Sequence, residues 1–481
     1  MPTASLTDVT FAYDGRPPAL TDVTATFAPG ECVMVTGRSG CGKTTVTRLL
    51  NGLAPEHFAG RLDGEARVGG LVAGQSSVQD YNGTVGSVFQ NPKTQYFHAN
   101  STDELSFPCE NAGLPSGEIH GRVRRAIMRF GIPHLLDRNV MELSGGQQQQ
   151  LAVAAATVLD PGVLVLDEPT GNLDADAMVR LHDMLAELKR DGVTIVIAEH
   201  RLAWCADLVD RYVLVEDGRI AGSWDACEFA ALPAERRREW GLRALDVTSA
   251  REATARLVER GLPGGEGTPV LATHDLVVGY GRRGLLRRRV GGFAKAVPDL
   301  QLFAGQMVGL MGRNGAGKST LVRTLCGLQP ACEGRIELDG RPASRRALTR
   351  GAALVMQDVH YQLFADSVRG ELMAEVRDGD DGDEARAKCD GLLRDLDLLD
   401  LADRHPMSLS GGQQQRLAIA TALMAGKRFV VLDEPTSGLD HAHMMQVGRL
   451  LRRLADRSVA VLVVTHDDEL VAQWCDGVVA L

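Results

Sequence analysis

The chain repeats itself along its length. Leu-Ser-Gly-Gly-Gln occurs at 143–147 and 409–413, and Leu-Asp-Glu-Pro-Thr occurs at 166–170 and 432–436. Four pairs of markers share one spacing of 266 positions, namely Ser144 and Ser410, Asp167 and Asp433, Asp174 and Asp440, and His200 and His466. Self-similarity at a fixed spacing indicates duplicated structural units. We therefore predict two tandem domains, at 1–224 and 269–481, joined by a linker at 225–268.

Short apolar runs in each copy predict strands that are buried on both faces, as in a parallel sheet. They lie at 32–36, 163–166 and 194–198 in the first copy, and at 307–311, 429–432 and 459–465 in the second. Helical patterns lie between them at 175–190 and 442–456, and in the linker at 233–245 and 249–260. Strands that alternate with helices predict an α/β fold with a mostly parallel core.

Composition excludes several classes of protein. Lys and Arg number 52 against 62 Asp and Glu, a formal charge of −10, whereas a general nucleic-acid binder is basic. The nine cysteines contain no C-x-x-C pair, so zinc ribbons and iron–sulfur sites lack ligands. No signal peptide is recognisable, and no apolar run approaches the ~18–20 residues that span a bilayer. We expect any membrane role to come through a partner.

Two glycine-rich segments, 37–44 and 312–319, match G-x-x-x-x-G-K-[ST]. Each follows an apolar strand and opens a predicted helix, so backbone N–H groups and the positive helix end would face phosphate oxygens. The lysine would reach the β- and γ-phosphates, and the hydroxyl suits Mg²⁺. The candidate nucleotide-binding residues are Gly37, Gly40, Gly42, Lys43, Thr44 and Thr45, with Gly312, Gly315, Gly317, Lys318, Ser319 and Thr320.

Acidic pairs end two of the apolar strands. Asp167 and Asp433 lie at the carboxyl edge of the predicted sheet, where ligands bind, and each is a candidate for Mg²⁺. Glu168 and Glu434 come next and are candidates to polarise an attacking water. Phosphoryl transfer needs mainly such positioning and charge neutralisation.

The Leu-Ser-Gly-Gly-Gln motif decides the family. Each copy offers bare N–H groups and a hydroxyl before a predicted helix, at Ser144, Gly145, Gly146 and Gln147 and at Ser410, Gly411, Gly412 and Gln413. With this motif beside the phosphate loops, the chain resembles the nucleotide-binding domains of ATP-binding-cassette (ABC) proteins over nearly all its length. The resemblance implies two P-loop domains, each with a mostly parallel core sheet, an antiparallel β subdomain and a helical subdomain.

The resemblance also assigns roles to matching residues. Tyr13 and Tyr280 would stack on adenine, Gln90 and Gln357 would sense Mg²⁺ and a transporter partner, Asp174 and Asp440 would couple two sites, and His200 and His466 would contact the γ-phosphate. Family members pair head to tail, so each ATP would lie between one copy's phosphate loop and the other copy's signature motif. One departure is Gln150, where the second copy has the more usual Arg416.

Two local segments narrow the choice of transporter. Residues 88–97 (VFQNPKTQYF) resemble the F-Q-N-P-x-x-Q-[IL]-F segment of energy-coupling-factor (ECF) ATPases, 355–364 is a looser version, and 198–202 (AEHRL) also resembles fused ECF ATPases. Such a protein hydrolyses ATP, with Mg²⁺, to energise import of a vitamin, a vitamin precursor, or cobalt or nickel ions. Its partners are a transmembrane coupling protein and a membrane substrate-binding component, and it lies peripherally on the cytoplasmic face. Gln95-Tyr96-Phe97 and Gln362-Leu363-Phe364 are expected to be exposed docking residues.

Other interpretations stay open at this point. One is an ATPase of another ABC transporter class, although fused sugar-importer ATPases usually carry a degraded second phosphate loop. Another is a soluble ABC ATPase of translation or repair, although those carry a long charged linker or zinc cysteines. The basic insertion at 281–295 is either a solvated hairpin or a contact for anionic lipid or a partner. The sequence does not reveal the transported substrate.

Overall fold

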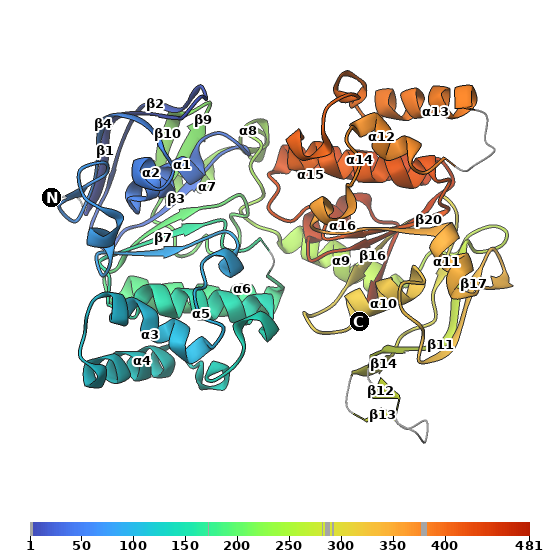
Figure 1. Ribbon diagram of the computed structural model, residues 1–481, viewed down its shortest axis with the longest axis horizontal. Coiled ribbons are helices and arrows are strands. Elements are labelled where there is room, and N and C mark those ends of the chain that lie inside the picture. Colours follow the sequence, from blue (N-terminus) through green and yellow to red (C-terminus); the bar gives the residue numbers. More distant parts are fainter. Residues whose placement is uncertain (1–2, 172, 281, 284–288, 291–292, 377–381) are drawn as a thin grey trace. The chain divides into compact units, whose positions relative to one another are not determined.

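The computed structural model describes residues 3–171, 173–280, 282–283, 289–290, 293–376 and 382–481. They form two compact units, one of residues 1–246 with 438–442 and the other of 247–437 with 443–481. The basic insertion predicted at 281–295 lies mostly outside the described residues. Figure 1 traces the first unit from blue to green and the second from yellow to red.

The core of the first unit is a six-stranded sheet in the order β10-β9-β3-β8-β7-β6. The strands are β3 (Cys32–Thr36), β6 (Val85–Val88), β7 (Val163–Asp167), β8 (Thr194–Ala198), β9 (Arg211–Glu216) and β10 (Arg219–Asp225). All neighbouring pairs are parallel except β9 and β10. β3 and β8 are buried along their whole length, which explains their unbroken apolar sequences.

A second, antiparallel sheet of the first unit has the order β2-β1-β4-β5. Its strands are β1 (Ala4–Tyr13), β2 (Pro18–Phe27), β4 (Gly60–Val68) and β5 (Leu71–Val72). The helices are α1 (Lys43–Leu50), α2 (Leu53–Glu56), α3 (Ser101–Asn111), α4 (Ser116–Phe130), α5 (Gly145–Thr157), α6 (Ala175–Arg190), α7 (Ala226–Ala231) and α8 (Ala234–Glu239). α3, α4 and α5 contact one another and form a helical part, which lies apart from the antiparallel sheet (Figure 1).

The second unit repeats this plan. Its parallel core has the order β19-β20-β21-β16-β22, with β16 (Met307–Met311), β19 (Ala352–Val355), β20 (Phe429–Asp433), β21 (Ala460–Val464) and β22 (Gly477–Ala480). Its antiparallel sheet contains β11 (Leu271–Gly279), β14 (Ala294–Ala296), β15 (Gln301–Leu302), β17 (Glu333–Leu338) and β18 (Arg341–Pro342), and β12 (Arg282–Arg283) pairs with β13 (Arg289–Val290).

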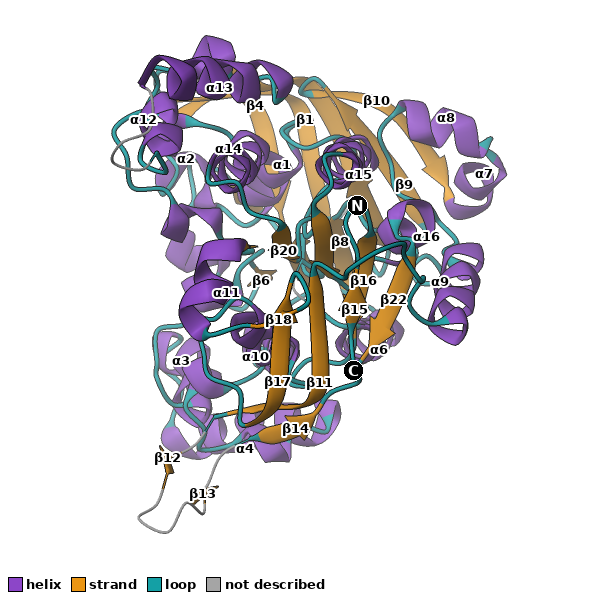
Figure 2. Cartoon of the chain, turned by 90° about the vertical axis from the view of Figure 1, so that its right-hand side faces the viewer, coloured by secondary structure: helices purple, strands orange, loops and turns teal. Residues whose placement is uncertain are grey.

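The helices of the second unit are α9 (Thr248–Arg260), α10 (Lys318–Leu325), α11 (Arg345–Gly351), α12 (Val368–Met373), α13 (Gly382–Asp395), α14 (Gly411–Met424), α15 (His441–Asp456) and α16 (Asp468–Trp474). In Figure 2, α12, α13 and α14 lie at one end of this unit and β11, β14 and β17 at the other. The predicted α/β fold, with its parallel cores, antiparallel sheets and helical parts, is confirmed.

The segment 225–268 contains three helices, α7, α8 and α9, which belong to different units. Phe229 of α7 stacks on Tyr212 of β9, with ring centroids 4.1 Å apart, so α7 extends the core of the first unit. α9 contacts α16 and β22 of the second unit. The predicted helix at 249–260 is confirmed, whereas the one at 233–245 is reduced to α8. The exact domain boundaries stay a prediction. Among the residues that the structure describes, no helix combines the length and the apolar character needed to cross a membrane.

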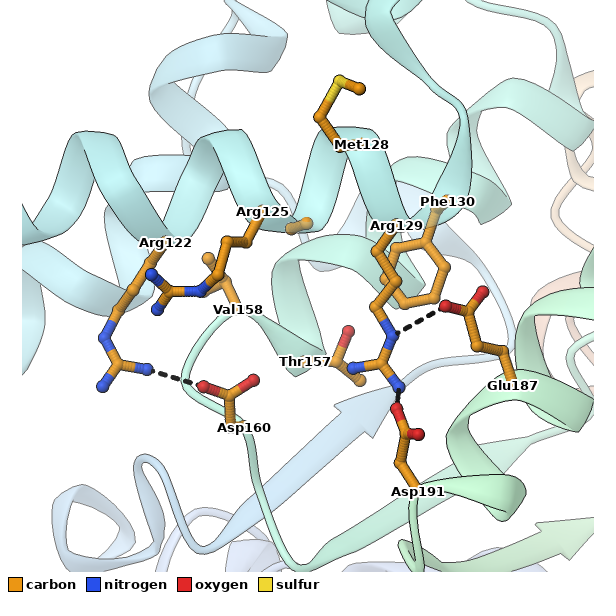
Figure 3. Close-up of a pocket in the computed structure, with 11 residues that line it drawn as sticks. Arg122, Arg125, Met128, Arg129, Phe130, Thr157, Val158, Asp160, Glu187 and Asp191 are labelled. Atoms are coloured by element: carbon orange, nitrogen blue, oxygen red, sulfur yellow. Dashed lines mark hydrogen bonds and ion pairs between the residues drawn. The ribbon is translucent and has the colours of Figure 1, made fainter.

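A cavity of about 500 Å³ lies in the first unit where the helical part meets α6. Figure 3 shows Arg129 of α4 reaching across it toward two carboxylates near the end of α6. Arg129 Nε lies 3.4 Å from Glu187 Oε1, and its other nitrogen pairs with Asp191. These ion pairs tie the helical part to the core.

The second unit has the equivalent cavity, of about 350 Å³, with the charges reversed. The positions that correspond to Arg129, Glu187 and Asp191 at the spacing of 266 are Asp395, Arg453 and Arg457. Arg457 pairs with the Asp395 carboxylate, and Arg453 Nη1 donates to the Asp395 carbonyl at 3.4 Å. Both units therefore keep the ion pair, although every charge in it has changed sign.

We expect Arg129→Asp to destabilise the first unit by about 1 kcal/mol or less, because the pair is partly exposed and screened. The variant places three carboxylates together. Adding Glu187→Arg and Asp191→Arg imports the arrangement of the second unit and should recover the loss. The measurement is the thermal unfolding midpoint at low and high salt.

Arg125→Asp is the matched control, because Arg125 is exposed on the same helix and makes the same change of charge. A melting point for Arg129→Asp equal to that of Arg125→Asp at low salt, or a triple variant no more stable than Arg129→Asp, would contradict the stabilising role of the ion pair.

Candidate active site

The phosphate loop of the first unit requires its glycines. Gly37 and Gly42 have φ of 147° and 115°, where L side chains are strained. A Cβ on Gly37 would lie 2.1 Å from the Val215 carbonyl oxygen, and one on Gly42 would lie 2.8 Å from that of Ala19. The loop leads into α1, whose first residue is the buried Lys43. Lys43 Nζ donates to the carbonyl oxygens of Gly37 and Arg38 at 3.1 and 3.0 Å.

The phosphate loop of the second unit has the same conformation. Gly312, Gly315 and Gly317 have φ of 151°, 80° and 99°, close to the values of their counterparts. Lys318 Nζ donates to the Gly312 carbonyl at 2.6 Å. In this unit Lys318 Nζ also lies 3.0 Å from His466 Nε2, so the lysine and the histidine meet directly.

The carboxyl edge of the first core sheet brings five candidate residues together. Thr44 Oγ1 donates to Asp167 Oδ1 at 3.2 Å. Glu168 Oε2 accepts from Gln90 Nε2 at 2.7 Å, and Glu168 Oε1 lies 3.1 Å from His200 Nε2. Residues from α1, β6, β7 and β8 therefore converge on the space in front of the phosphate loop.

Both glutamates have a backbone conformation that side chains rarely adopt. Glu168 and Glu434 have φ of 43° and 48°, and their N–H groups donate to the carbonyls of Ala198 and Val464 at 2.8 and 2.9 Å. Strain of this kind persists where surrounding structure enforces it, often at functional sites. In the second unit, Glu434 Oε1 lies 3.5 Å from His466 Nε2.

Electrostatics at the sheet edge suit a divalent cation. Burial, and then the charge of Glu168, raise the pKa of Asp167 to about 6, and burial likewise raises the pKa of Asp433. A cation would relieve the repulsion between the adjacent carboxylates. Among the described residues, no three His, Cys, Asp or Glu side chains form a metal cluster. Mg²⁺ usually keeps several waters and is bound by one or two carboxylates together with phosphate oxygens.

The signature motifs begin α5 and α14. Ser144 Oγ accepts from Gln147 N at 3.3 Å while Gln147 Oε1 accepts from Ser144 N at 2.9 Å, and Ser410 and Gln413 form the same capping box. The side chains of Gln147 and Gln413 therefore cap the N-termini of their own helices. Gly146 has a packing reason as well, because its Cβ would lie 2.5 Å from that of Ala177 on α6.

The remaining candidates occupy varied surroundings. Tyr13 Oη lies 3.1 Å from Thr45 Oγ1, beside the phosphate loop, whereas Tyr280 is exposed and stacks on Phe293. Asp174 caps α6 by accepting from Ala177 N at 2.8 Å. Within the first compact unit, Asp440 Oδ2 accepts from Ser39 N of the phosphate loop at 2.8 Å.

Part of the docking prediction is wrong. Leu363 is buried, and Tyr96 packs against the first unit's core and donates to the Gln148 carbonyl at 2.5 Å. Of the six predicted docking residues, only Phe97 and Phe364 are exposed, at 76% and 83%. The sequence prediction missed the buried carboxylates Glu104 and Glu371, which bind the backbone at these two positions. Their signal was an acidic residue seven positions after each phenylalanine.

Comparison with known proteins agrees with this geometry. A family model described as ABC transporter matches residues 20–171 and 297–437. A putative ABC transporter ATP-binding protein of Treponema denticola is 37% identical over 478 residues, covering 99% of this chain and 95% of its own. The chain belongs to the ABC transporter ATP-binding family. It is an ABC ATPase with two cassettes fused in one chain, and it uses ATP with Mg²⁺.

Other relatives extend over the same length. A putative ABC transporter ATP-binding protein of Streptomyces avermitilis is 35% identical over 525 residues, covering 98% of this chain and 91% of its own. A solved structure titled RNase-L Inhibitor has a TM-score of 0.62 at 21% identity, covering 98% of this chain and 87% of that one. At this low identity, the similarity to the RNase-L Inhibitor structure concerns the fold alone.

Proposed function

We propose that this ABC ATPase is the ATP-hydrolysing subunit of an ECF-type importer of a micronutrient. It would lie peripherally on the cytoplasmic face of the membrane, bound to a transmembrane coupling protein and a membrane substrate-binding component. The observation that carries the proposal is the pair of exposed phenylalanines, Phe97 and Phe364, each at the end of the segment that resembles ECF ATPases.

The glutamine of that segment fixes the loop to the core sheet. Gln95 Oε1 accepts from Phe89 N at 3.1 Å, and Gln95 Nε2 donates to the Ser87 carbonyl at 2.8 Å. Gln362 makes the equivalent bonds with Met356 N and the Leu354 carbonyl, at 2.8 and 2.6 Å. The loop that follows Gln90 is thus tied to the end of β6, and Gln90 itself bonds to Glu168.

A buried carboxylate fixes each phenylalanine from the other side. Glu104 Oε2 accepts from the N–H groups of Phe97 and His98 at 3.0 and 2.8 Å. Glu371 Oε2 accepts from those of Phe364 and Ala365 at 3.0 and 2.7 Å. Exposed aromatic side chains on a backbone that is held in place are typical anchors for a partner. An apolar helix of a membrane protein is a suitable occupant.

The catalytic roles that we propose are those that the family resemblance implies, and the contacts among Thr44, Asp167, Gln90, Glu168 and His200 support them in the first unit. Glu168 and Glu434 would polarise the attacking water, and His200 and His466 would contact the γ-phosphate. Asp167 with Thr44, and Asp433 with Ser319, would hold Mg²⁺, aided by Gln90 and Gln357. The two lysines and the loop N–H groups would bind phosphates. By analogy with the family, the Ser410 motif would complete the site of Lys43, and the Ser144 motif that of Lys318.

Glu168→Gln combined with Glu434→Gln should turn over ATP at least about 10²-fold more slowly, the usual contribution of a lost general base. ATP binding should persist, because the phosphate loops are unchanged. Steady-state hydrolysis and equilibrium ATP binding are measured on the same preparation. Near-normal turnover in the double variant would disprove the assignment.

Phe97→Asp combined with Phe364→Asp should release the protein from membranes of cells that contain its partners. A carboxylate buried against an apolar helix is desolvated, at a cost of several kcal/mol. ATP turnover of the free protein should stay near normal, because neither side chain contacts a phosphate loop. The measurement is membrane flotation beside ATP turnover.

Met128→Asp with Leu328→Asp is the matched control, because both residues are exposed apolar side chains, at 73% and 52%, outside these segments. Flotation of the phenylalanine variant equal to that of the control would show that docking lies elsewhere. Cosedimentation with ribosomes in place of membranes would favour the soluble class of ABC ATPase.

A further inference from the structure

In each unit a buried threonine follows the catalytic glutamate by two positions and binds a buried carboxylate. Thr170 Oγ1 donates to Glu199 Oε1 at 2.9 Å in the first unit. Thr436 Oγ1 donates to Asp467 Oδ2 at 2.8 Å in the second. Both threonines are fully buried, so each hydroxyl depends on this acceptor.

The two carboxylates come from opposite sides of the histidine. The threonines obey the spacing of 266, but the position equivalent to Glu199 is Thr465, and the position equivalent to Asp467 is Arg201. Glu199 therefore precedes His200, whereas Asp467 follows His466. Both units therefore have a threonine–carboxylate hydrogen bond, but the carboxylate of the second unit lies two equivalent positions later in the sequence than that of the first.

Glu199 joins three segments of the first site. Its Oε1 also accepts from Arg201 N at 3.0 Å, just past the histidine. Its backbone N–H donates to the Val35 carbonyl at 3.1 Å, and its carbonyl accepts from Thr36 Oγ1 at 3.1 Å, next to the phosphate loop. Glu199 thus links the strand that leads into the phosphate loop, the turn after Glu168 and the residue that follows His200.

Asp467 bonds to its own segment and to the start of α16. Its N–H donates to Thr465 Oγ1 at 3.0 Å, and its Oδ1 accepts from Leu470 N at 3.3 Å, which caps α16. The first unit has no helix at the equivalent positions 202–208. Arg201, the equivalent of Asp467, has no side-chain acceptor that could cap one.

Keeping Glu199 in place is costly. Its side chain is almost fully buried, and Oε2 has no hydrogen-bond partner among the described residues. Burial, and then the charge of Glu168, raise the pKa of Glu199 to about 7, while Arg201 N, Thr170 and the Arg201 charge favour the ionised form. An acid retained at such a site must make contacts that an apolar residue would not replace.

We propose that Glu199 and Asp467 are equivalent positioning residues, which hold the turn behind each catalytic glutamate at a fixed place relative to the histidine. The inference rests on the proposed roles of Glu168, Glu434 and the two histidines. Both carboxylates are buried and bond to protein groups behind the site, so each acts through the residues proposed to face the nucleotide.

The test begins with removal of both carboxylates. Glu199→Thr with Asp467→Thr keeps a capping residue for α16 and should lower kcat about tenfold, the usual size of a lost outer-shell contact. KM for ATP should change by no more than about twofold, since ground-state binding is untouched. Melting points of all variants are recorded alongside.

The second step moves the carboxylate in the first unit to the place it has in the second. Glu199→Thr with Arg201→Asp should turn over faster than Glu199→Thr alone and approach the unmodified protein. Glu199→Gln with Asp467→Asn keeps the acceptor oxygens without charge, and should retain most of the turnover even if the threonine variant fails to fold.

Three results would overturn the proposal. They are normal kcat after removal of both carboxylates, no gain from Arg201→Asp over Glu199→Thr alone, or equal losses in the Gln/Asn and threonine variants at unchanged melting points. The proposed catalytic role is judged separately. If Glu168→Gln with Glu434→Gln is slow while the threonine variant is normal, only the positioning role is wrong.

Discussion

Parallel pairing between β7 and β8, and between β20 and β21, sets the geometry of both sites. Asp167 lies opposite Ala198 in the first unit, and Asp433 lies opposite Val464 in the second. The residue that follows each aspartate is Glu168 or Glu434. Its N–H donates to the neighbouring strand, and its positive φ turns the chain out of the sheet. This register sets how close Glu168 lies to His200 and how close Glu434 lies to His466. A shift of one residue would reverse which side chains face the phosphate loop.

Much of this fold could be predicted because its strands and helices are strongly patterned. The helix predicted at 175–190 matches α6 at both ends, and the apolar runs at 32–36 and 194–198 match β3 and β8. Lys43, Glu168 and His200 could be predicted at one edge of the sheet because the phosphate loop, the acidic pair and the histidine each follow an apolar strand. Local pattern and tertiary packing agree in these elements, which is typical of foldable sequences.

Other features depend on contacts that sequence spacing does not contain. Tyr96 and Phe97 are neighbours with similar character, yet one is packed against the core and the other is exposed. Tyr96 Oη donates to the Gln148 carbonyl and the Phe97 N–H donates to Glu104, and these tertiary contacts determine which side chain points outward. The linker helix predicted at 233–245 ends early at Glu239, and four residues later Arg243 is fully buried. Long-range packing decides both outcomes.

The two units keep the same contacts with different residues. The ion pair at Arg129 is reversed at Asp395, and the carboxylate that binds the buried threonine precedes the histidine in the first unit, at Glu199, but follows it in the second, at Asp467. Both changes preserve a bond while altering its chemistry. The phosphate loops, the strained glutamates and the histidines have not diverged in this way, and on this basis we claim that both cassettes bind ATP.

The number of ATP molecules bound per chain tests that claim most directly. Equilibrium dialysis with Mg²⁺-ATP on the Glu168→Gln and Glu434→Gln double variant should give two ATP molecules per chain. Lys43→Ala or Lys318→Ala should each leave one, and the two together none. A single ATP per chain before any lysine is changed, or a stoichiometry that ignores one of the lysines, would contradict the account.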